Sequence, residues 1–133
     1  MSTVRLIPDE DLSPEAKIVF DEIRALRGTT YVNNIWRALA HDPALLRRTW
    51  DGVRDVMAPG ALDPLTKELI YVAVSIANNC EYCIRSHTTA ARAKGMSEAQ
   101  YMELVAVVAA ASQTNRLATA LQVPVDEAFK AVP

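Results

Sequence analysis

The chain has 133 residues, 50% of them hydrophobic and 23% charged, and its formal net charge is −2. This is the composition of a globular protein, and it excludes a disordered chain. A net charge so close to zero argues against nucleic acid as a partner, because a protein that binds nucleic acid usually carries a basic patch. We therefore expect a single domain over residues 1–133, large enough to bury a core without metal or disulfide staples.

No segment near the N-terminus has the apolar core of a signal peptide. The longest apolar stretches, near residues 69–77 and 104–111, are much shorter than the ~20 residues that span a bilayer. These patterns predict a cytoplasmic protein with no membrane partner. In that reducing compartment the two cysteines are more typical of catalysis or metal binding than of a structural staple.

Several helix starts share one signature, in which a side-chain acceptor at the N-cap precedes a proline at the first helical position. They are Ser13-Pro14, Asp42-Pro43 and Asp63-Pro64. Ser97 begins another helix as a capping box with Gln100, and Gly28 and Gly95 mark helix ends after basic last turns. The predicted helices cover residues 14–27, 43–57, 64–78, 81–94 and 98–120, with a short helix over 33–40 capped by Asn33.

No segment shows the alternation of a strand, so the fold class is all-α. The first helix carries an apolar stripe of Ala16, Val19, Phe20, Ile23 and Leu26. Helix 64–78 is apolar nearly all round, which is typical of a helix buried in the middle of a domain. The alanine-rich helix 98–120 is either a core helix, an oligomer seam or both. Trp36 and Trp50 are expected in the core or in an interface.

The polar exceptions on helix 64–78 fall on one face. Glu68, Tyr71 and Ser75 are spaced i, i+3 and i+7. A carboxylate on so apolar a helix must be paired, hydrogen-bonded or poised for proton transfer. Glu68 is therefore a candidate functional residue, or else it forms a structural ion pair with Arg85 or another arginine.

The strongest chemical pattern is Cys80, Cys83 and His87, which lie at i, i+3 and i+7. On a helix these three side chains share one face. Cys80 stands at the helix N-terminus, where unpaired amide groups favour a thiolate. His87 lies one turn beyond Cys83 and could accept the thiol proton.

The pair Asn78-Asn79 separates the two helices that carry these residues, and asparagine tolerates the left-handed conformation that ends a helix. We expect the helices to form an antiparallel hairpin around this turn. Counting about 1.5 Å per residue from the turn places Glu68 nearest His87, with Cys83 one helical turn further along. The arrangement predicts a proton relay Glu68–His87–Cys83.

Glu68, Cys80, Cys83 and His87 have the spacing found in the carboxymuconolactone decarboxylase superfamily, and the chain resembles its alkylhydroperoxidase AhpD-like branch. The resemblance covers most of the chain, from residues 5–15 through residues 34–41 to the helix ending near Leu121. It implies an all-α, AhpD-like helical bundle built on an antiparallel helical hairpin and assembled as a trimer or hexamer.

The resemblance also implies an activity, that of a thiol-dependent peroxidase. Cys83 would attack a hydroperoxide, and Cys80 would resolve the sulfenic acid to a Cys80–Cys83 disulfide. Glu68 and His87 would move the proton. An external dithiol of the lipoyl or thioredoxin type would restore the pair. The redox-active disulfide would be the only redox group, with no other cofactor and no metal.

Other interpretations stay open. The residues between the cysteines are Glu81 and Tyr82, where the best-known branch members carry a histidine, so a non-catalytic, redox-switched oligomeric adaptor is one alternative. A decarboxylase-type enzyme acting on a small lactone or keto acid is another.

The site itself also has less specific interpretations. Two buried structural cysteines, or a zinc site completed by His41 or Glu68, would use the same residues differently. Tyr82 and Ser86, together with Tyr71, are weaker candidates for lining a substrate site.

Overall fold

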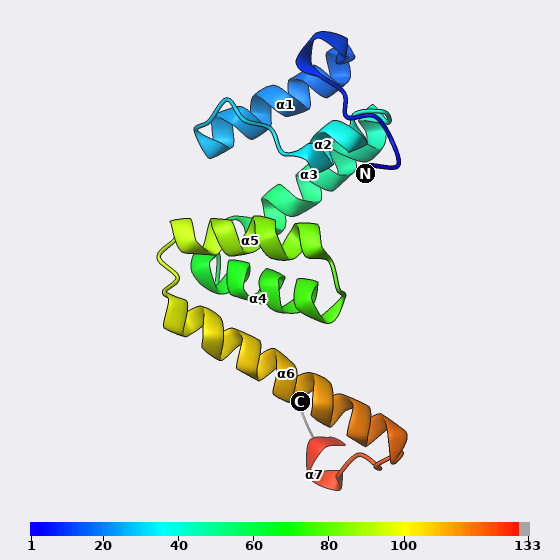
Figure 1. The fold of residues 1–133 in the computed structure, drawn as a ribbon, viewed down its shortest axis with the longest axis vertical. Coiled ribbons are helices and arrows are strands. Elements are labelled where there is room, and N and C mark those ends of the chain that lie inside the picture. The colour runs from blue at the N-terminus through cyan, green and yellow to red at the C-terminus, as the bar shows by residue number, and fades with distance from the viewer. Residues whose placement is uncertain (131–133) are drawn as a thin grey trace. The chain divides into compact units, whose positions relative to one another are not determined.

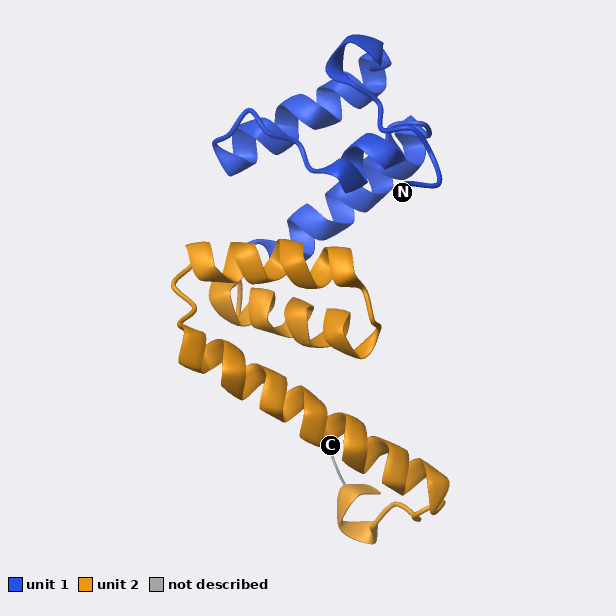
Figure 2. Ribbon diagram, in the orientation of Figure 1, with its two compact units in different colours: residues 1–58 blue, residues 59–133 orange. Residues whose placement is uncertain are grey.

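The computed structural model describes residues 1–130. Every regular element in that range is helical, so the predicted all-α class is confirmed there. The chain divides into two compact units (Figure 2), unit 1 over residues 1–58 and unit 2 over residues 59–133. A single domain over residues 1–133 remains a prediction, and residues 131–133 lie outside the described part.

Unit 1 opens with a short 3₁₀ turn, Asp9–Asp11, followed by helices that enclose one apolar core. These helices are α1 (Pro14–Arg27), α2 (Asn34–Leu39) and α3 (Pro43–Met57) (Figure 1). Trp36 and Trp50 are both buried in the core, as predicted, and their rings meet edge to face with centroids 5.5 Å apart. This contact joins α2 to α3.

The stripe predicted on α1 is correct except for its last member. The fully buried members are Ala16, Val19, Phe20 and Ile23. Leu26 is instead 64% exposed. Its neighbour Arg27 is also exposed, but its guanidinium carbon lies 5.9 Å and 5.7 Å from the ring centres of Trp36 and Trp50. The helix then ends at Gly28, which adopts the left-handed conformation with φ of 63°.

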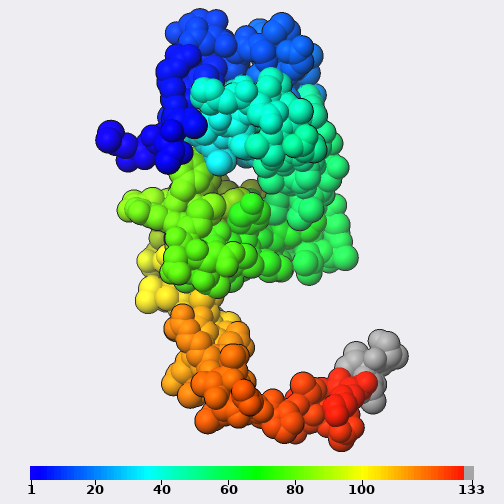
Figure 3. Space-filling model, turned by 90° about the vertical axis from the view of Figure 1, so that its right-hand side faces the viewer, coloured from blue at the N-terminus to red at the C-terminus, as the bar shows by residue number. Residues whose placement is uncertain are grey.

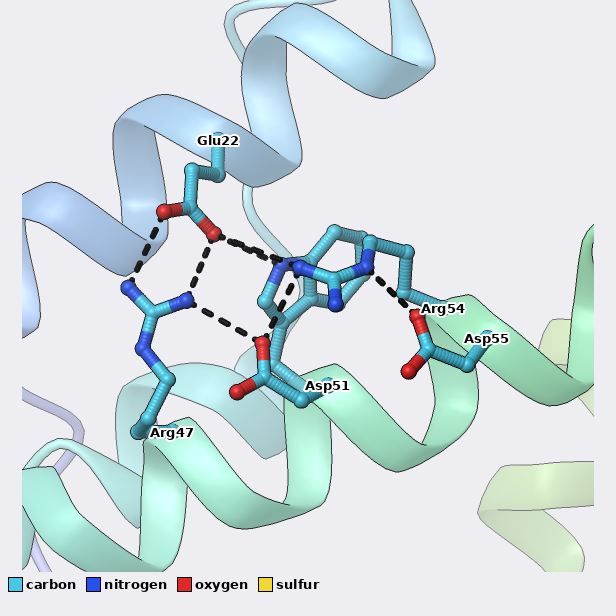
Figure 4. Close-up of polar contacts among 6 residues, drawn as sticks. Glu22, Arg47, Asp51, Arg54 and Asp55 are labelled. Atoms are coloured by element: carbon cyan, nitrogen blue, oxygen red, sulfur yellow. Dashed lines mark hydrogen bonds and ion pairs between the residues drawn. The ribbon is translucent and has the colours of Figure 1, made fainter.

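A polar cluster ties α1 to α3 beside this core (Figure 4). Both oxygens of Glu22 accept hydrogen bonds from Arg47, at 2.7 and 3.1 Å, and Trp50 Nε1 donates to the same carboxylate at 3.2 Å. Asp51 lies between Arg47 and Arg54, 3.1 and 3.0 Å from their Nη1 atoms. Such a two-pronged pairing of guanidinium and carboxylate fixes orientation as well as distance.

The predicted helix starts are confirmed, with one exception in detail. The N-cap side chains that accept backbone hydrogen bonds are Ser13, Asp42, Asp63 and Ser97. Ser97 and Gln100 form both halves of the predicted capping box. Asn33 stands at the N-cap of α2 but caps nothing with its side chain, because its Oδ1 accepts a hydrogen bond from Arg27 instead.

Unit 2 is built on a helical hairpin. Its elements are α4 (Pro64–Ala77), α5 (Glu81–Ala93), α6 (Glu98–Ala120) and the short α7 (Glu127–Lys130). Helices α4 and α5 lie side by side and antiparallel, as predicted (Figure 1). At the turn, Asn79 takes the left-handed conformation with φ of 56°, and the Cys80 amide donates to the Ser75 carbonyl at 3.0 Å.

Helix α4 is not buried on all sides, contrary to the prediction. Ile70 is 48% exposed and Val74 is 53% exposed. Within unit 2, α4 packs against α5 and α6, and these two neighbours cover only part of its circumference. The apolar composition of α4 therefore exceeds what its own unit buries.

Helix α6 is not a core helix of this chain, because none of its residues is buried. Tyr101, Leu104, Val105 and Val108 are partly covered. A second apolar face, which we call the α6 stripe, is exposed; it comprises Val107, Ala110, Ala111, Thr114, Leu117, Ala118 and Leu121. The second half of α6 extends beyond the α4–α5 hairpin (Figures 1 and 3). None of the described helices is long and apolar enough to cross a membrane.

Candidate functional site

The α4–α5 hairpin brings together the residues that the sequence singled out. Asp63 caps α4 through its hydrogen bond with the Thr66 amide, and the antiparallel turn then aligns the first half of α4 with the second half of α5. Glu68 and Tyr71 on α4 consequently meet His87 on α5. All three side chains lie within unit 2.

Cys80 and Cys83 form a disulfide, with Cα atoms 5.3 Å apart. Cys80 is the N-cap of α5, and its Sγ accepts a hydrogen bond from the Cys83 amide at 3.3 Å. Amide groups at a helix N-terminus stabilise negative charge. The position of Cys80 therefore favours a thiolate on that sulfur when the pair is reduced.

Glu68 is the buried acid of the site. Its side chain is 7% exposed, and its Oε2 lies 2.7 Å from Nδ1 of His87, as the hairpin prediction required. Its Oε1 accepts a hydrogen bond from Nζ of Lys94 at 3.0 Å. Burial by itself raises the pKa of Glu68, but hydrogen bonds from His87 and Lys94 and the charge of Lys94 outweigh it, so the pKa is lowered.

The imidazole of His87 is held on two sides. Glu68 engages Nδ1, and the ring of Tyr71 stacks on its face. Nε2 is the nitrogen left to exchange a proton. Cys83 lies one helical turn before His87 on the same face of α5, so the sulfur pair and the imidazole share one neighbourhood.

The weaker candidates divide. Tyr71 belongs to the cluster, but as the ring that packs on His87 rather than as a lining residue. Tyr82 is 42% exposed and Ser86 is half-buried on α5, close in sequence to the cysteines. Their role in lining a substrate site stays a prediction.

The partner suggested for Glu68 was wrong. Arg85 pairs with Glu81 on the exposed side of α5, at 2.9 Å, and Lys94 takes the place proposed for an arginine. The sequence held a signal for Lys94, since it follows His87 by seven residues, and i and i+7 share a helix face. His41 lies in unit 1, where Nε2 is 2.7 Å from the Arg5 carbonyl oxygen.

Among residues 1–130 there is no group of three or more His, Cys, Asp and Glu side chains placed to hold a metal ion. The geometry that is present combines a sulfur pair, an oriented imidazole and a buried carboxylate. These are the parts required to move a proton to and from sulfur.

Comparison with known proteins assigns the family. Residues 43–126 match the model of the carboxymuconolactone decarboxylase family, and this range includes every residue of the cluster. The chain belongs to the carboxymuconolactone decarboxylase family. The resemblance identified from the spacing of Glu68, Cys80, Cys83 and His87 is thereby confirmed.

Individual relatives place the chain within the family. The crystal structure of an alkylhydroperoxidase AhpD core from Rhodospirillum rubrum is similar over 99% of both chains, with 61% identity and a TM-score of 0.95. The fold of this family member is therefore AhpD-like. A curated relative, uncharacterized protein 4 in the cox locus of Paracoccus denitrificans, is 46% identical over 54 residues. That match spans 41% of this chain and 49% of the relative.

Proposed function

We propose that this chain is a thiol-dependent peroxidase and disulfide oxidoreductase that cycles Cys80 and Cys83 between dithiol and disulfide. The observation that carries the proposal is a cysteine pair one helical turn from His87, whose imidazole is held by the buried Glu68 carboxylate. The AhpD-like fold supports it, because the similar structure from Rhodospirillum rubrum is described as an alkylhydroperoxidase AhpD core.

The first step is attack on a hydroperoxide by Cys83. His87 takes the thiol proton, and the thiolate attacks the terminal oxygen of the substrate. A sulfur–oxygen bond forms and the oxygen–oxygen bond breaks. The departing alkoxide takes the proton back from His87 and leaves as an alcohol, so that Cys83 is oxidised to a sulfenic acid.

The second step is resolution by Cys80. Its thiolate attacks the sulfenic sulfur, the disulfide forms, and the hydroxyl group leaves as water after taking up a proton. The hydrogen bond from the Cys83 amide to Cys80 Sγ supports this role, since it favours the thiolate of the attacking sulfur.

The third step is reduction of the disulfide by an external dithiol of the lipoyl or thioredoxin type. One thiolate of the reductant forms a mixed disulfide and its second thiol completes the exchange. The reductant ends as a disulfide, and both cysteines return to thiols. The proposal needs no further cofactor.

The partner proposed for the α6 stripe is a second copy of the chain. The stripe presents small and apolar side chains at seven positions on one face of α6, and Val107, Leu117 and Leu121 are each more than half exposed. A monomer would leave this face in water, whereas small residues allow close approach of another helix. This supports a homo-oligomer, for which the resemblance implies a trimer or hexamer.

Intact mass spectrometry tests the redox step. The reduced protein should lose about two mass units with one equivalent of an organic hydroperoxide and regain them with a dithiol. Cys80→Ser and Cys83→Ser should each abolish hydroperoxide turnover. Thr89→Ala, on the exposed side of α5, is the matched control and should leave turnover unchanged.

Other outcomes assign other functions. A disulfide that forms without turnover, but alters assembly, would replace the peroxidase with a redox-switched adaptor. Activity on a small lactone or keto acid that survives replacement of both cysteines would replace it with a decarboxylase-type enzyme. Full peroxidase activity in either single cysteine variant would overturn the two-cysteine mechanism.

A further inference from the structure

Both carboxylate oxygens of Glu68 are hydrogen-bonded to residues of α5 or its C-cap. Oε2 is 2.7 Å from Nδ1 of His87, and Oε1 is 3.0 Å from Nζ of Lys94. These two partners are seven residues apart on the helix, so they reach one buried carboxylate from the same face. Lys94 stands at the C-cap of α5, where the helix dipole favours a cation.

The contacts decide which group can take a proton. A carboxylate whose two oxygens each accept a hydrogen bond from a cationic or N–H donor is a weak base. With Nδ1 donating to that carboxylate, the lone pair of the imidazole is on Nε2. The pair therefore separates two tasks, since Glu68 orients the ring and Nε2 exchanges the proton.

We propose that Lys94 is a positioning residue of the thiol chemistry, holding Glu68 as an anion through the reaction so that Nε2 of His87, and not Glu68, takes the thiol proton. This inference rests on the proposed function. The proton passes from Cys83 to Nε2 and then to the departing alkoxide, while the charges of Glu68 and Lys94 stay the same throughout.

The electrostatic surroundings agree with this assignment. The groups that lower the pKa of Glu68 are its two partners on α5, His87 through its hydrogen bond and Lys94 through its hydrogen bond and charge. On the helix of Glu68 itself, the ring of Tyr71 stacks on His87. On α6, which also packs against α4, Glu98 pairs with Arg92. The guanidinium of Arg92 in turn lies over the ring of Tyr101, with its carbon 5.5 Å from the ring centre. Lys94 is thus the lysine whose hydrogen bond and charge help keep Glu68 ionised.

The test compares Lys94→Gln with Lys94→Arg. Glutamine can still donate a hydrogen bond to Glu68 but carries no charge, whereas arginine keeps the charge. Lys17→Gln removes a lysine from an exposed ion pair with Asp21 on α1 and is the matched control. The first readout is the titration of the Glu68 carboxyl group, which ¹³C NMR records in the oxidised protein. The second is the pH profile of disulfide formation after one equivalent of cumene hydroperoxide.

In Lys94→Gln, Glu68 should titrate at higher pH. The acid limb of the pH–rate profile should shift to higher pH by the same amount. The rate should fall about tenfold on that limb and approach the wild-type rate at alkaline pH. Lys94→Arg should restore both readouts. A merely structural role would instead lower the rate equally at every pH, and that result would overturn the proposal.

An unchanged Glu68 titration in Lys94→Gln would also overturn it. If that variant does not fold, the titration of wild-type Glu68 serves instead. A pKa of Glu68 at or above the ordinary value of a glutamate would then overturn the proposal. The titration does not depend on turnover. A wild-type protein that ignores hydroperoxide, yet shows the shifted titration, would therefore remove the proposed function and leave the hold of Lys94 on Glu68 standing.

Discussion

Tyr71 lies nearly flat on His87, with ring centroids 3.6 Å apart and ring planes 18° from parallel. The two rings come from different helices, α4 and α5, so the contact is part of the packing of the hairpin as well as of the site. Glu68 fixes one edge of the imidazole, and Tyr71 fixes its plane. Together they leave the ring little freedom.

Replacing Tyr71 should therefore slow thiol oxidation without touching sulfur. Stacked aromatic pairs are worth about 0.5–1.5 kcal/mol, which corresponds to up to about tenfold in rate. We expect Tyr71→Leu to lower the single-turnover rate of disulfide formation by that amount. Tyr71→Phe keeps the stack and should remain near the wild-type rate. Equal losses in both variants would assign the effect to the hydroxyl instead.

Acid should remove the stabilisation that Glu68 provides. Because its pKa is lowered in the folded protein, its contribution is present above the ordinary value of 4.5 and is lost as the pH falls through the lowered value. Glu68→Gln should reduce the free energy of unfolding by about 1–2 kcal/mol at neutral pH. Urea unfolding at a series of pH values should show this difference shrinking below pH 4.5.

The control for that series is Glu81→Gln. Glu81 pairs with Arg85, but both side chains are 79% exposed, so the substitution should change stability little at any pH. A Glu68→Gln difference that persisted undiminished in acid would contradict the assignment of the stabilisation to the carboxylate charge.

The cluster in Figure 4 should stabilise the packing of α1 on α3. The pKa of Glu22 is lowered, chiefly by its hydrogen bond from Arg47. A hydrogen bond from Trp50 and the charges of Arg47 and Arg54 add to this effect, and together they outweigh burial. The side chains of Glu22, Arg47 and Arg54 are 34–40% exposed, so we expect Glu22→Gln to cost about 0.5–1 kcal/mol, and less at high salt. Chemical denaturation at two salt concentrations measures this, with Lys17→Gln on the same helix as the weaker comparison.

A charge on the α6 stripe should break the proposed oligomer. Leu117→Asp places a carboxylate within a face that would become apolar and dry on association. Sedimentation velocity should show a shift to smaller species, while Gln113→Glu, beside the stripe on the same helix, should leave the assembly unchanged. A wild-type protein that sediments as a monomer would contradict the proposed partner.

Local signals predicted the helices well because they act over a few residues. The N-caps at Asp42, Asp63 and Ser97 depend only on the next turn of chain, and all three form. Asn33 does not cap α2 with its side chain, because its Oδ1 accepts a hydrogen bond from Arg27, which the folding of unit 1 brings near. A rule based on N-cap preferences does not include competition from a residue outside the helix.

The site was predictable where one helix carried the pattern and less so across the hairpin. The spacing of Cys80, Cys83 and His87 fixes their shared face, and the Asn78-Asn79 turn fixes which part of α4 they meet. The second partner of Glu68 depends on which long side chain can bend back at the end of α5. Lys94 has that reach, whereas Arg85 faces away and pairs with Glu81.

The described contacts of the cluster all fall between Glu68 and Lys94, inside the α4–α5 hairpin. A short stretch of chain thus carries its own acid, imidazole and sulfur pair in register. The chemistry proposed for this chain therefore depends on the turn and on the residue spacing within one hairpin, because none of these contacts involves another helix.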